Sequence, residues 1–542
     1  MAYIGIDFGS TYTTVSVYRK ETGMVEALSM SSSPYTPTTA ALMGDKYEFG
    51  KAARARTGKK GASIYKGFKM LLPETDQELL RARGYDGGHT PRSIASQFLE
   101  HCLRQALSDL HETQVDSLVV GAPEIWQEKE QGKEALRDIF RDMAFVKNTQ
   151  VVSEPVAATA FFAYNFKRIT GKEFSGNILL IDYGGGTLDL TLTRVLAGNA
   201  PGAVEIQVME RTGAGENENG RIGQAGIVYM ETVAAEAIAR ILGVRPEPDG
   251  RFYRAVDSLE EELQTRTEVL QETFDEYGTQ YPEDLDFEFT SLEYQGEEIP
   301  VTYALLVECY DRVIRPVLEE QLDHMIGYMK KANIPYMDRE QDVFKIALVG
   351  GFGNFYLVRQ QLQEKFRFST MDRRQEHIIV NRADREKAIS MGAAMLSAGA
   401  ISVCSSAPCT IGVLSRDVTG KSWADYALKK GQTLEYGKPY FAADAHTGAA
   451  GAYLVTQGRL TRLLVEDETG KALWAPMKES YARRVADAIR DELQVASVGF
   501  SVEPSGILFL HLRRQGEEDR QVELTQFQEL FDWPGAKQVN AL

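Results

Sequence analysis

Two segments of the sequence repeat one arrangement of residues that could bind phosphate. Residues 4–18 read IGIDFGSTYTTVSVY, and residues 179–193 read LLIDYGGGTLDLTLT. In each, an apolar run ends in an aspartate, Asp7 or Asp182, and a glycine-rich turn leads into a second run of alternating polarity. Glycines in such a turn let backbone N–H groups converge on a phosphate, because no Cβ stands in the way. The two matched copies, each with a carboxylate at the strand end, predict a duplicated unit that presents two phosphate-binding β-hairpins.

Neither turn is of the Walker type, because no Gly-Lys-Ser/Thr is present and a strand follows instead of a helix. A third glycine element reads FKIALVGGFGNFYLVRQQL over residues 344–362. There, a strand expected over 346–349 meets Gly350 and Gly351, and a helix follows. This pattern suits close approach of the backbone to a base or a ribose, and it also suits an ordinary turn between a strand and a helix. Both interpretations stay open from the residues alone.

The elements that would position these motifs alternate between strands and helices. Apolar spacing predicts helices over residues 92–110, 128–143, 156–164 and 257–272, and buried strands over 117–121 and 150–153. Such alternation predicts an α/β fold.

The pattern changes after about residue 400. Residues 401–409 (ISVCSSAPC) show no clear element and are expected to be a linker. Short strands are then expected over residues 410–414, 440–442, 452–455, 463–466, 497–502 and 507–512, with a helix over 479–493. The last two strands are expected to form a hairpin, and the whole region is expected to be a β-rich second module.

Composition limits the possible partners. The chain has 542 residues, 43% of them hydrophobic, and a formal net charge of −17. This charge disfavours nucleic acid as a partner. Four cysteines in so long a chain argue against a disulfide framework, and Cys404 and Cys409 are expected to be small apolar residues in a reducing compartment. We find no secretory signal and no apolar run long enough to span a membrane, so we expect a soluble, cytoplasmic protein.

These motifs resemble those of the DnaK-type heat shock protein 70 chaperones, within the superfamily of sugar kinases, heat-shock proteins and actin. The resemblance rests on IGIDFGSTY (4–12), GFKMLL (67–72), LVVGAPEIW (118–126), VVSEPVAATAFFAY (151–164), ILLIDYGGGTLDLTL (178–192), IALVGGFGN (346–354) and REKAISMGAA (385–394). It extends more loosely to GFSVEPSGILFLHL (499–512).

The resemblance implies a duplicated, actin-like (ribonuclease H-like) ATPase domain of two lobes over residues 1–400. Lobe I would span about 1–170 and 385–400, and lobe II about 171–384. A linker (401–409), a β-rich, sandwich-like substrate-binding domain (410–512) and a short tail (513–542) would follow. Such a tail would be too short for the family's helical lid.

The resemblance also implies the ligands ATP or ADP with Mg²⁺. Asp7 and Asp182 would hold the metal mainly through its waters. The catalytic residues would be Lys69, Glu154, Asp182 and Thr187, with Asp189 in support. The residues expected to bind the nucleotide are Gly9, Ser10, Thr11, Tyr12, Gly184, Gly185, Gly186, Thr187, Glu262, Arg266, Gly350, Gly351, Phe352 and Asn354.

Other interpretations of single residues stay open. Lys66 competes with Lys69 for the role of the cation near the phosphate. Glu154 could be a charge at a helix N-terminus. Glu262 and Arg266 could simply be an i, i+4 pair.

The sequence departs from the family pattern at several positions. Phe352, Gly353 and Asn354 stand where the family usually has Ser, Thr and Arg, which leaves adenine affinity and base preference open. Gln131 stands where a basic residue is expected eight positions after Pro123. The acidic, leucine-rich linker of the family is replaced by residues 401–404 (ISVC).

The primary hypothesis is a lidless, DnaK-like chaperone with slow ATP hydrolysis. Its β-rich domain would bind a polypeptide client or a dedicated protein partner, with possible co-chaperones. The alternative is a nucleotide-gated scaffold or regulatory binding protein with little ATPase activity. A small-molecule kinase or an actin-like filament protein fits less well.

Overall fold

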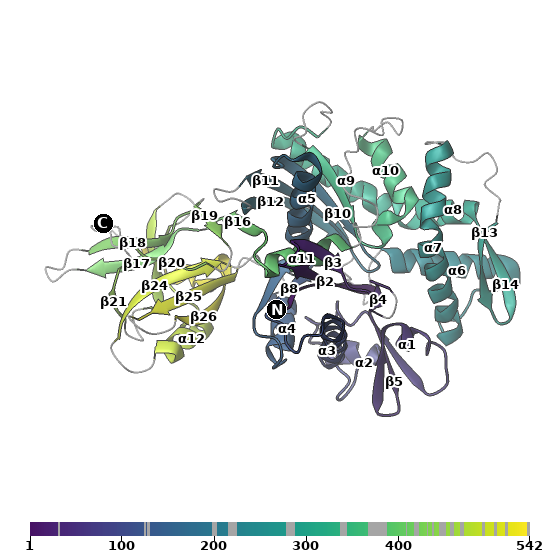
Figure 1. The fold of residues 1–542 in the computed structure, drawn as a ribbon, viewed down its shortest axis with the longest axis horizontal. Helices are drawn as coiled ribbons and strands as arrows, with labels where there is room; N and C mark the ends of the chain where they lie inside the picture. The colour runs from purple at the N-terminus through teal and green to yellow at the C-terminus, as the bar shows by residue number, and fades with distance from the viewer. Residues whose placement is uncertain are drawn as a thin grey trace. The chain divides into compact units, whose positions relative to one another are not determined.

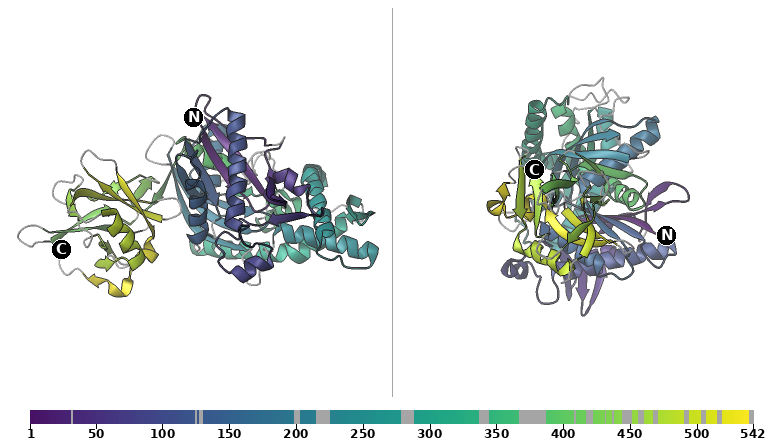
Figure 2. Two further views of the ribbon diagram at one scale, coloured as in Figure 1. Left: turned by 90° about the horizontal axis from the view of Figure 1, so that it is seen from below. Right: turned by 90° about the vertical axis from the view of Figure 1, so that its left-hand side faces the viewer.

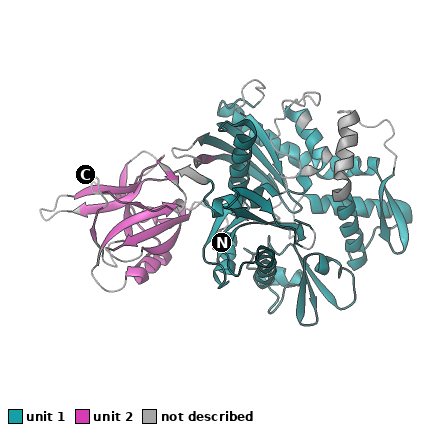
Figure 3. Ribbon diagram, viewed as in Figure 1, with its two compact units in different colours: residues 1–197, 208–401 teal, residues 198–207, 402–542 magenta. Residues whose placement is uncertain are grey.

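The structure is a computed structural model that divides into two compact units (Figure 3). Unit 1 comprises Met1–Ala197 and Val208–Ile401, and unit 2 comprises Gly198–Gln207 and Ser402–Leu542. The residues that the structure describes are 1–30, 33–123, 126, 130–197, 203–214, 225–277, 288–336, 344–366, 387–407, 409–416, 422–430, 432–435, 438–443, 451–455, 460–466, 471–489, 494–502, 507–514 and 519–538. The fold is a mixed α/β fold with several sheets, as predicted.

One sheet of unit 1 is built around the first aspartate hairpin. Strand β1 (Tyr3–Phe8) pairs antiparallel with β2 (Tyr12–Arg19), with Asp7 opposite Thr14. On its other side β1 pairs parallel with β8 (Ser117–Ala122), and β8 pairs parallel with β9 (Thr149–Ser153). Strands β3 (Met24–Ala27) and β4 (Thr36–Pro37) both pair with β2.

A second sheet repeats this arrangement around the second aspartate. Strand β10 (Gly176–Tyr183) pairs antiparallel with β11 (Leu188–Ala197), with Asp182 opposite Asp189. Its other neighbour, β15 (Phe344–Val349), is parallel. Both predicted hairpins are therefore confirmed. In each, the first strand has its hairpin partner on one side and a parallel strand on the other. The following strand β12 (Ala203–Ala214) passes from unit 2 into unit 1 after Gln207.

Each sheet has a hydrophobic core of its own. The core of the first sheet joins β1, β2 and β8 to α3 (Pro91–Leu110) and α4 (Glu130–Arg141). Helix α3 begins at a capping box, in which the side chains and backbones of Thr90 and Ser93 bond reciprocally. The core of the second sheet joins β10, β11 and β15 to helices that include α6 (Gly226–Leu242) and α7 (Gly250–Tyr277).

Unit 1 contains further helices and two small sheets besides these (Figure 1). The helices are α1 (Gly50–Arg54), α2 (Gln77–Ala82), α5 (Glu154–Thr170), α8 (Tyr303–Val313), α9 (Arg315–Lys331), α10 (Tyr356–Phe366) and α11 (Ala388–Ser397). The remaining strands are β5 (Thr39–Met43), β6 (Lys46–Phe49) and β7 (Ala62–Lys66) in one small sheet, and β13 (Glu288–Tyr294) with β14 (Glu297–Thr302) in another. The predicted helices and strands all coincide with observed elements, and α7 begins seven positions before the predicted 257–272 segment.

Unit 2 consists mainly of strands, with α12 (Glu479–Ile489) against β26 (Arg520–Gln526), as Figure 2 shows in yellow and green. One sheet contains β17 (Ile411–Arg416), β18 (Ser422–Leu428), β22 (Arg462–Glu466), β23 (Ala472–Pro476) and β27 (Lys537–Gln538). The other contains β20 (Tyr440–Phe441), β21 (Tyr453–Val455), β24 (Gln494–Val502), β25 (Ile507–Arg513) and β26. Residues of both sheets share one hydrophobic core, which includes Ile411, Leu463, Phe500 and Leu510.

Two sequence predictions about the C-terminal region are wrong. Ser402–Ser406 form strand β16, which pairs parallel with residues 203–205 and antiparallel with β19 (Thr433–Glu435), so the expected linker contains regular structure. One of its two strand partners, residues 203–205, lies about two hundred positions away, where no local pattern could reveal it. Residues 513–542 are not merely a tail, because they contain β26, α13 (Phe527–Leu530) and β27. Strand β26 was missed although its sequence carries a strand signal, because its buried Val522 and Leu524 alternate with charged and polar residues.

Within the described ranges, no helix combines the length and the apolar character that crossing a membrane requires.

Candidate functional site

Three neighbouring strand ends bring the expected carboxylates and glycines together. Asp7 is the last but one residue of β1, close to the turn of the first hairpin, and Asp182 lies opposite Val349 in the parallel pair of β10 and β15. Gly350 follows directly and has a φ of +79°. A Cβ at Gly350 would lie 2.5 Å from Oδ1 of Asp182, so only glycine fits between β15 and this carboxylate.

A buried ion pair faces the two aspartates. Nζ of Lys69, in the turn after β7, lies 2.9 Å from Oε1 of Glu154, the first residue of α5. Only 4% and 7% of these side chains are exposed. Lys66, the competing cation, instead pairs with Asp257 of α7 at 2.6 Å. Of the two lysines, Lys69 is the one that interacts with Glu154, Asp7 and Asp182.

The site has more negative charge than its lysine can balance. Burial, followed by the charge of Glu154, raises the pKa of Asp7 to about 7, although Lys69 opposes the shift. Burial and the charges of Glu154, Asp7 and Asp189 raise the pKa of Asp182 well above its ordinary value. Burial alone lowers the pKa of Lys69, but the charges of Glu154 and Asp7 outweigh it and leave that pKa raised. A bound cation would therefore be stabilised here.

The two hairpin turns touch each other. A Cβ at Gly185 would lie 1.9 Å from Oγ1 of Thr11, so the second turn packs directly on the first. The amide of Ile227, at the start of α6, donates to the carbonyl of Gly185 at 2.8 Å. The amide of Thr38 donates to the carbonyl of Thr11 at 2.7 Å, and its hydroxyl donates to that of Gly9 at 2.8 Å. Neighbouring elements thus fix both turns.

One cavity of about 610 Å³ in unit 1 collects most of the predicted residues. Its lining includes Asp7, Gly9, Ser10, Thr11, Tyr12, Lys69, Glu154, Asp182, Gly184, Gly185, Gly186, Thr187, Gly350, Gly351 and Phe352. Glu262 does not line it, whereas its neighbours on α7, Glu260 and Leu263, do. The side chains of Arg266 and Asn354 lie outside the described residues.

Sequence reasoning missed a second charged group in this cavity. Nη1 of Arg54 donates to the hydroxyl of Tyr12 at 2.5 Å, and Nη2 pairs with Glu260 and, at 3.4 Å, with Asp257. Lys66 completes the group through Asp257. The available signal was the i, i+3 spacing of Asp257 and Glu260, which places two carboxylates on one face of a helix.

The donor set is compatible with a hydrated divalent cation. Mg²⁺ usually keeps several waters and takes one or two carboxylates from the protein, as Asp7 and Asp182 could supply. Among the described residues there is no group of three or more His, Cys, Asp or Glu side chains arranged to hold a metal directly.

Comparison with curated proteins gives matches of one kind. The chain is 25% identical over 219 residues to the chaperone protein dnaK1 of Prochlorococcus marinus, covering 36% of this chain and 31% of that protein. It is 24% identical over 218 residues to a heat shock 70 kDa protein of Neurospora crassa, covering 36% and 32%. It is 26% identical over 215 residues to the chaperone protein HscA of Proteus mirabilis, covering 36% and 33%.

The matched part spans about a third of the length of these relatives. No family model matches the chain. Through its N-terminal part, the chain is similar to proteins of the heat shock protein 70 family.

Proposed function

We propose that unit 1 binds ATP with Mg²⁺ in the 610 Å³ cavity and hydrolyses it slowly. The observation that carries this proposal is the meeting, in one cavity, of two glycine turns, the carboxyl groups of Asp7, Glu154 and Asp182, and Lys69. Turn N–H groups and a lysine suit phosphate, and the excess of carboxylates suits the metal that accompanies it. The family relationship supports the same ligand.

The residues of the site would act mainly by positioning and by charge. The turns at residues 9–12 and 184–187 would hold the phosphates from two sides. Asp7 and Asp182 would hold hydrated Mg²⁺, which supplies neutralisation of phosphate charge. Lys69, oriented by Glu154, would stabilise charge on the terminal phosphate, and Glu154, Asp182 and Thr187 would orient the attacking water.

The same proposal includes a division of residues 1–400 into two lobes. It also includes client binding by residues 410–512. The two similar sheets, each with a core of its own, support two lobes of common origin. The relatives' names include chaperones, which supports binding of a polypeptide client by the β-rich region, in an extended form along a strand edge. A cytoplasmic location and co-chaperone partners follow the same family relationship.

A second candidate is a nucleotide-gated scaffold that hydrolyses little ATP. The observation that favours it is Phe352, which lines the cavity and packs on Tyr183 and Tyr229 where the family pattern has a polar segment. Gln131, in place of a basic residue, further weakens the expected coupling between nucleotide and client. Neither observation suggests a small-molecule kinase or a filament protein.

Binding and single-turnover hydrolysis of ATP with Mg²⁺ test the proposal. We expect the wild type to bind and hydrolyse ATP, and Lys69→Ala and Asp182→Asn to bind it but lose hydrolysis. Lys167→Ala is the matched control, because Lys167 forms an exposed ion pair with Glu173. Failure of the wild type to bind ATP would contradict the proposal.

The affinity of an extended peptide in ATP and in ADP separates the two candidates. A clear difference between the two nucleotide states supports the chaperone. Equal affinities, together with negligible hydrolysis, would favour the scaffold.

A further inference from the structure

One edge of strand β23 in unit 2 is covered by a short segment of the same chain. On one side, β23 pairs along its whole length, Ala472–Pro476, with β22. On the other side, within the described part of the chain, β27 pairs only with Leu473 and Trp474 and is the last strand of the sheet. Cross-strand pairs are what stabilise a sheet, so β27 is the more weakly held neighbour of β23.

The chain that leads to β27 is anchored firmly before it reaches that strand. Leu530 and Phe531 are buried in the core of unit 2, and the carbonyl of Leu530 accepts a hydrogen bond from the amide of Lys478 at 2.9 Å. The amide of Asp532 donates to the carbonyl of Pro476, also at 2.9 Å. The anchor therefore brings the following residues to the edge of β23.

Residues 533–538, which we call the edge segment, lie nearer the surface than this anchor. They consist of a single 3-10 turn, Trp533–Gly535, followed by Ala536 and β27. Trp533 is half-buried, and Lys537 of β27 is exposed. The edge segment thus combines a firm attachment at its start with a more accessible strand at its end.

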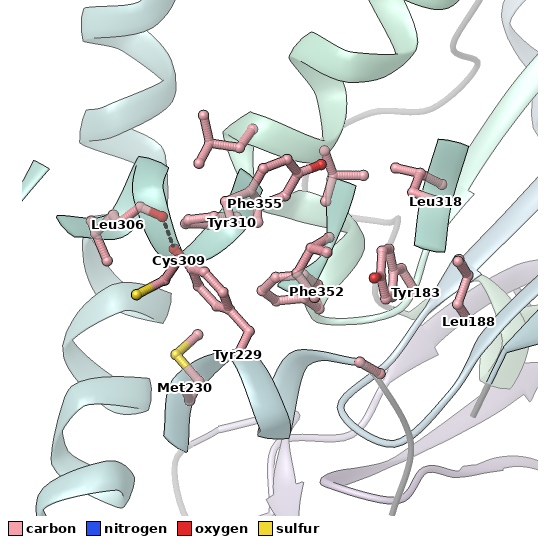
Figure 4. Packing of buried hydrophobic residues seen from close by; sticks show 14 of the residues in the cluster. Tyr183, Leu188, Tyr229, Met230, Leu306, Cys309, Tyr310, Leu318, Phe352 and Phe355 are labelled. Atoms are coloured by element: carbon pink, nitrogen blue, oxygen red, sulfur yellow. Dashed lines mark hydrogen bonds between the residues drawn. The ribbon is translucent and has the colours of Figure 1, made fainter. Parts of the chain in front are cut away.

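The aromatic contact of the edge segment is only partly shielded from solvent. The Trp533 ring lies 5.6 and 5.4 Å from the rings of Phe527 and Phe531. In the ring cluster of unit 1 that Figure 4 shows, Tyr229 and Phe355 have a similar centroid distance of 5.4 Å, but both of those rings are buried. Because part of Trp533 stays exposed, its packing stabilises the edge segment less than full burial would.

The residues of β27 match those of β23 poorly. Lys537 lies directly opposite Trp474, and Gln538 lies opposite Leu473. An aromatic residue in an antiparallel pair is stabilised by an aromatic or β-branched residue opposite it, and lysine is depleted in strands. A strand with valine, isoleucine or an aromatic residue at these two positions would therefore pair more favourably with β23 than β27 does.

We propose that the edge of β23 is a docking surface for an extended polypeptide with apolar residues, which adds as an antiparallel strand after displacing the edge segment. This inference rests on the proposed client binding by residues 410–512, and it names the strand to which the client adds. Strand β27 itself shows that this edge accepts an antiparallel strand. Main-chain hydrogen bonds of an added strand supply affinity, and the side chains opposite it supply specificity.

Two variants of the full chain that change β27 in opposite directions test the inference. The probe is a fluorescein-labelled peptide of alternating valine and threonine, and fluorescence anisotropy measures its affinity. Lys537→Gly/Gln538→Gly should weaken β27 and tighten peptide binding by about 5-fold to 30-fold, because the edge is open in more molecules. Lys537→Val/Gln538→Val should strengthen β27 and weaken peptide binding by about 5-fold.

Lys46→Gly is the matched control, because Lys46 is an exposed lysine on β6, an edge strand of unit 1. It should leave the peptide affinity as in the wild type. Equal affinities of the wild type and both β27 variants, or weaker binding by the glycine variant, would overturn the inference and leave client binding intact. Absence of peptide binding by all of these proteins would contradict client binding itself, and the inference with it.

Hydrogen exchange of the wild type provides an independent test that needs no substitution. Saturation with the same peptide should speed amide exchange in residues 533–538, because the edge segment leaves the sheet, and should leave the amides of β23 protected. A peptide that binds elsewhere would leave the exchange of the edge segment unchanged, and that result would overturn the inference.

Discussion

The guanidinium of Arg54 on α1 is paired with the carboxylate of Glu260 on α7, 206 positions away in the sequence. Only 15% and 22% of these side chains are exposed. Burial raises the pKa of Glu260 in spite of the charge of Arg54. Because Arg54 also bonds to the Tyr12 hydroxyl, the pair ties the turn of the first hairpin to α7 across the cavity.

We expect Arg54→Ala to destabilise unit 1 by about 3 kcal/mol, because Glu260 would keep a buried charge without its partner. The same change should speed the release of any bound nucleotide. Urea unfolding measures the first effect, and stopped-flow displacement of a fluorescent nucleotide measures the second.

The double variant Arg54→Ala/Glu260→Gln is the control for the pair. It should be less destabilised than the sum of the two single variants, since neither charge is then left alone. Additive effects would show that the ion pair contributes nothing of its own.

The contact of Gly185 with Thr11 leads to a second prediction. Gly185→Ala should force the two turns apart and destabilise unit 1 by about 1–3 kcal/mol, as overpacking does elsewhere. Binding of pyrophosphate with Mg²⁺ should weaken too, because both turns contact the phosphates in the proposed site. Calorimetry measures both effects.

Gly327→Ala is the matched control for this variant. Gly327 lies within α9, and a Cβ there would meet nothing within 4 Å. Alanine at this position should stabilise the helix by about 0.5–1 kcal/mol and leave ligand binding unchanged. Equal effects of the two substitutions would contradict the contact between the turns.

Removal of the charge of Glu154 tests the buried ion pair. Glu154→Gln should slow single-turnover ATP hydrolysis by about 100-fold or more while nucleotide still binds. Lys69 would lose its charged partner, and the attacking water would lose the carboxylate that acts as its base. Glu173→Gln, at an exposed glutamate, should have no effect. An unchanged rate in Glu154→Gln would remove Glu154 from the proposed mechanism.

A part of the fold could be predicted from the sequence only where the residues that indicate it lie close together in the chain. The hairpins of Asp7 and Asp182 were predictable, because alternation, aspartate and glycines follow one another within fifteen residues. The pairing of β16 with residues 203–205 was not, because it joins segments about two hundred positions apart.

The same limit applied to the site. Sequence spacing could not distinguish Lys69 from Lys66, and only the fold brings one to Glu154 and the other to Asp257. On α7 the prediction selected Glu262, whereas the helix turns Glu260 towards the cavity. A shift of two residues on a helix changes the face, so such a choice requires the neighbouring elements.

Unit 2 should be sensitive to acid because of a buried histidine. Nε2 of His511 in β25 lies 2.7 Å from the hydroxyl of Ser501 in β24, and His511 is only 6% exposed. Burial lowers the pKa of His511 below its ordinary value, with the charge of Asp519 opposing this shift and that of Arg513 adding to it. The unfolded chain therefore takes up a proton at a higher pH than the folded chain does. Stability should fall as the pH drops below about 6.5, the ordinary pKa of histidine.

Chemical unfolding at pH 7.5 and at pH 5.5, followed by tryptophan fluorescence, measures this effect, since Trp423, Trp474 and Trp533 all lie in unit 2. His511→Gln keeps a hydrogen-bonding side chain but cannot titrate, so its unit 2 should lose much less stability between the two pH values. His101→Gln, which removes a histidine of unit 1, should leave the pH response of unit 2 as in the wild type. If the wild type and His511→Gln lose the same stability, the acid response comes from other groups and His511 makes no net contribution to it.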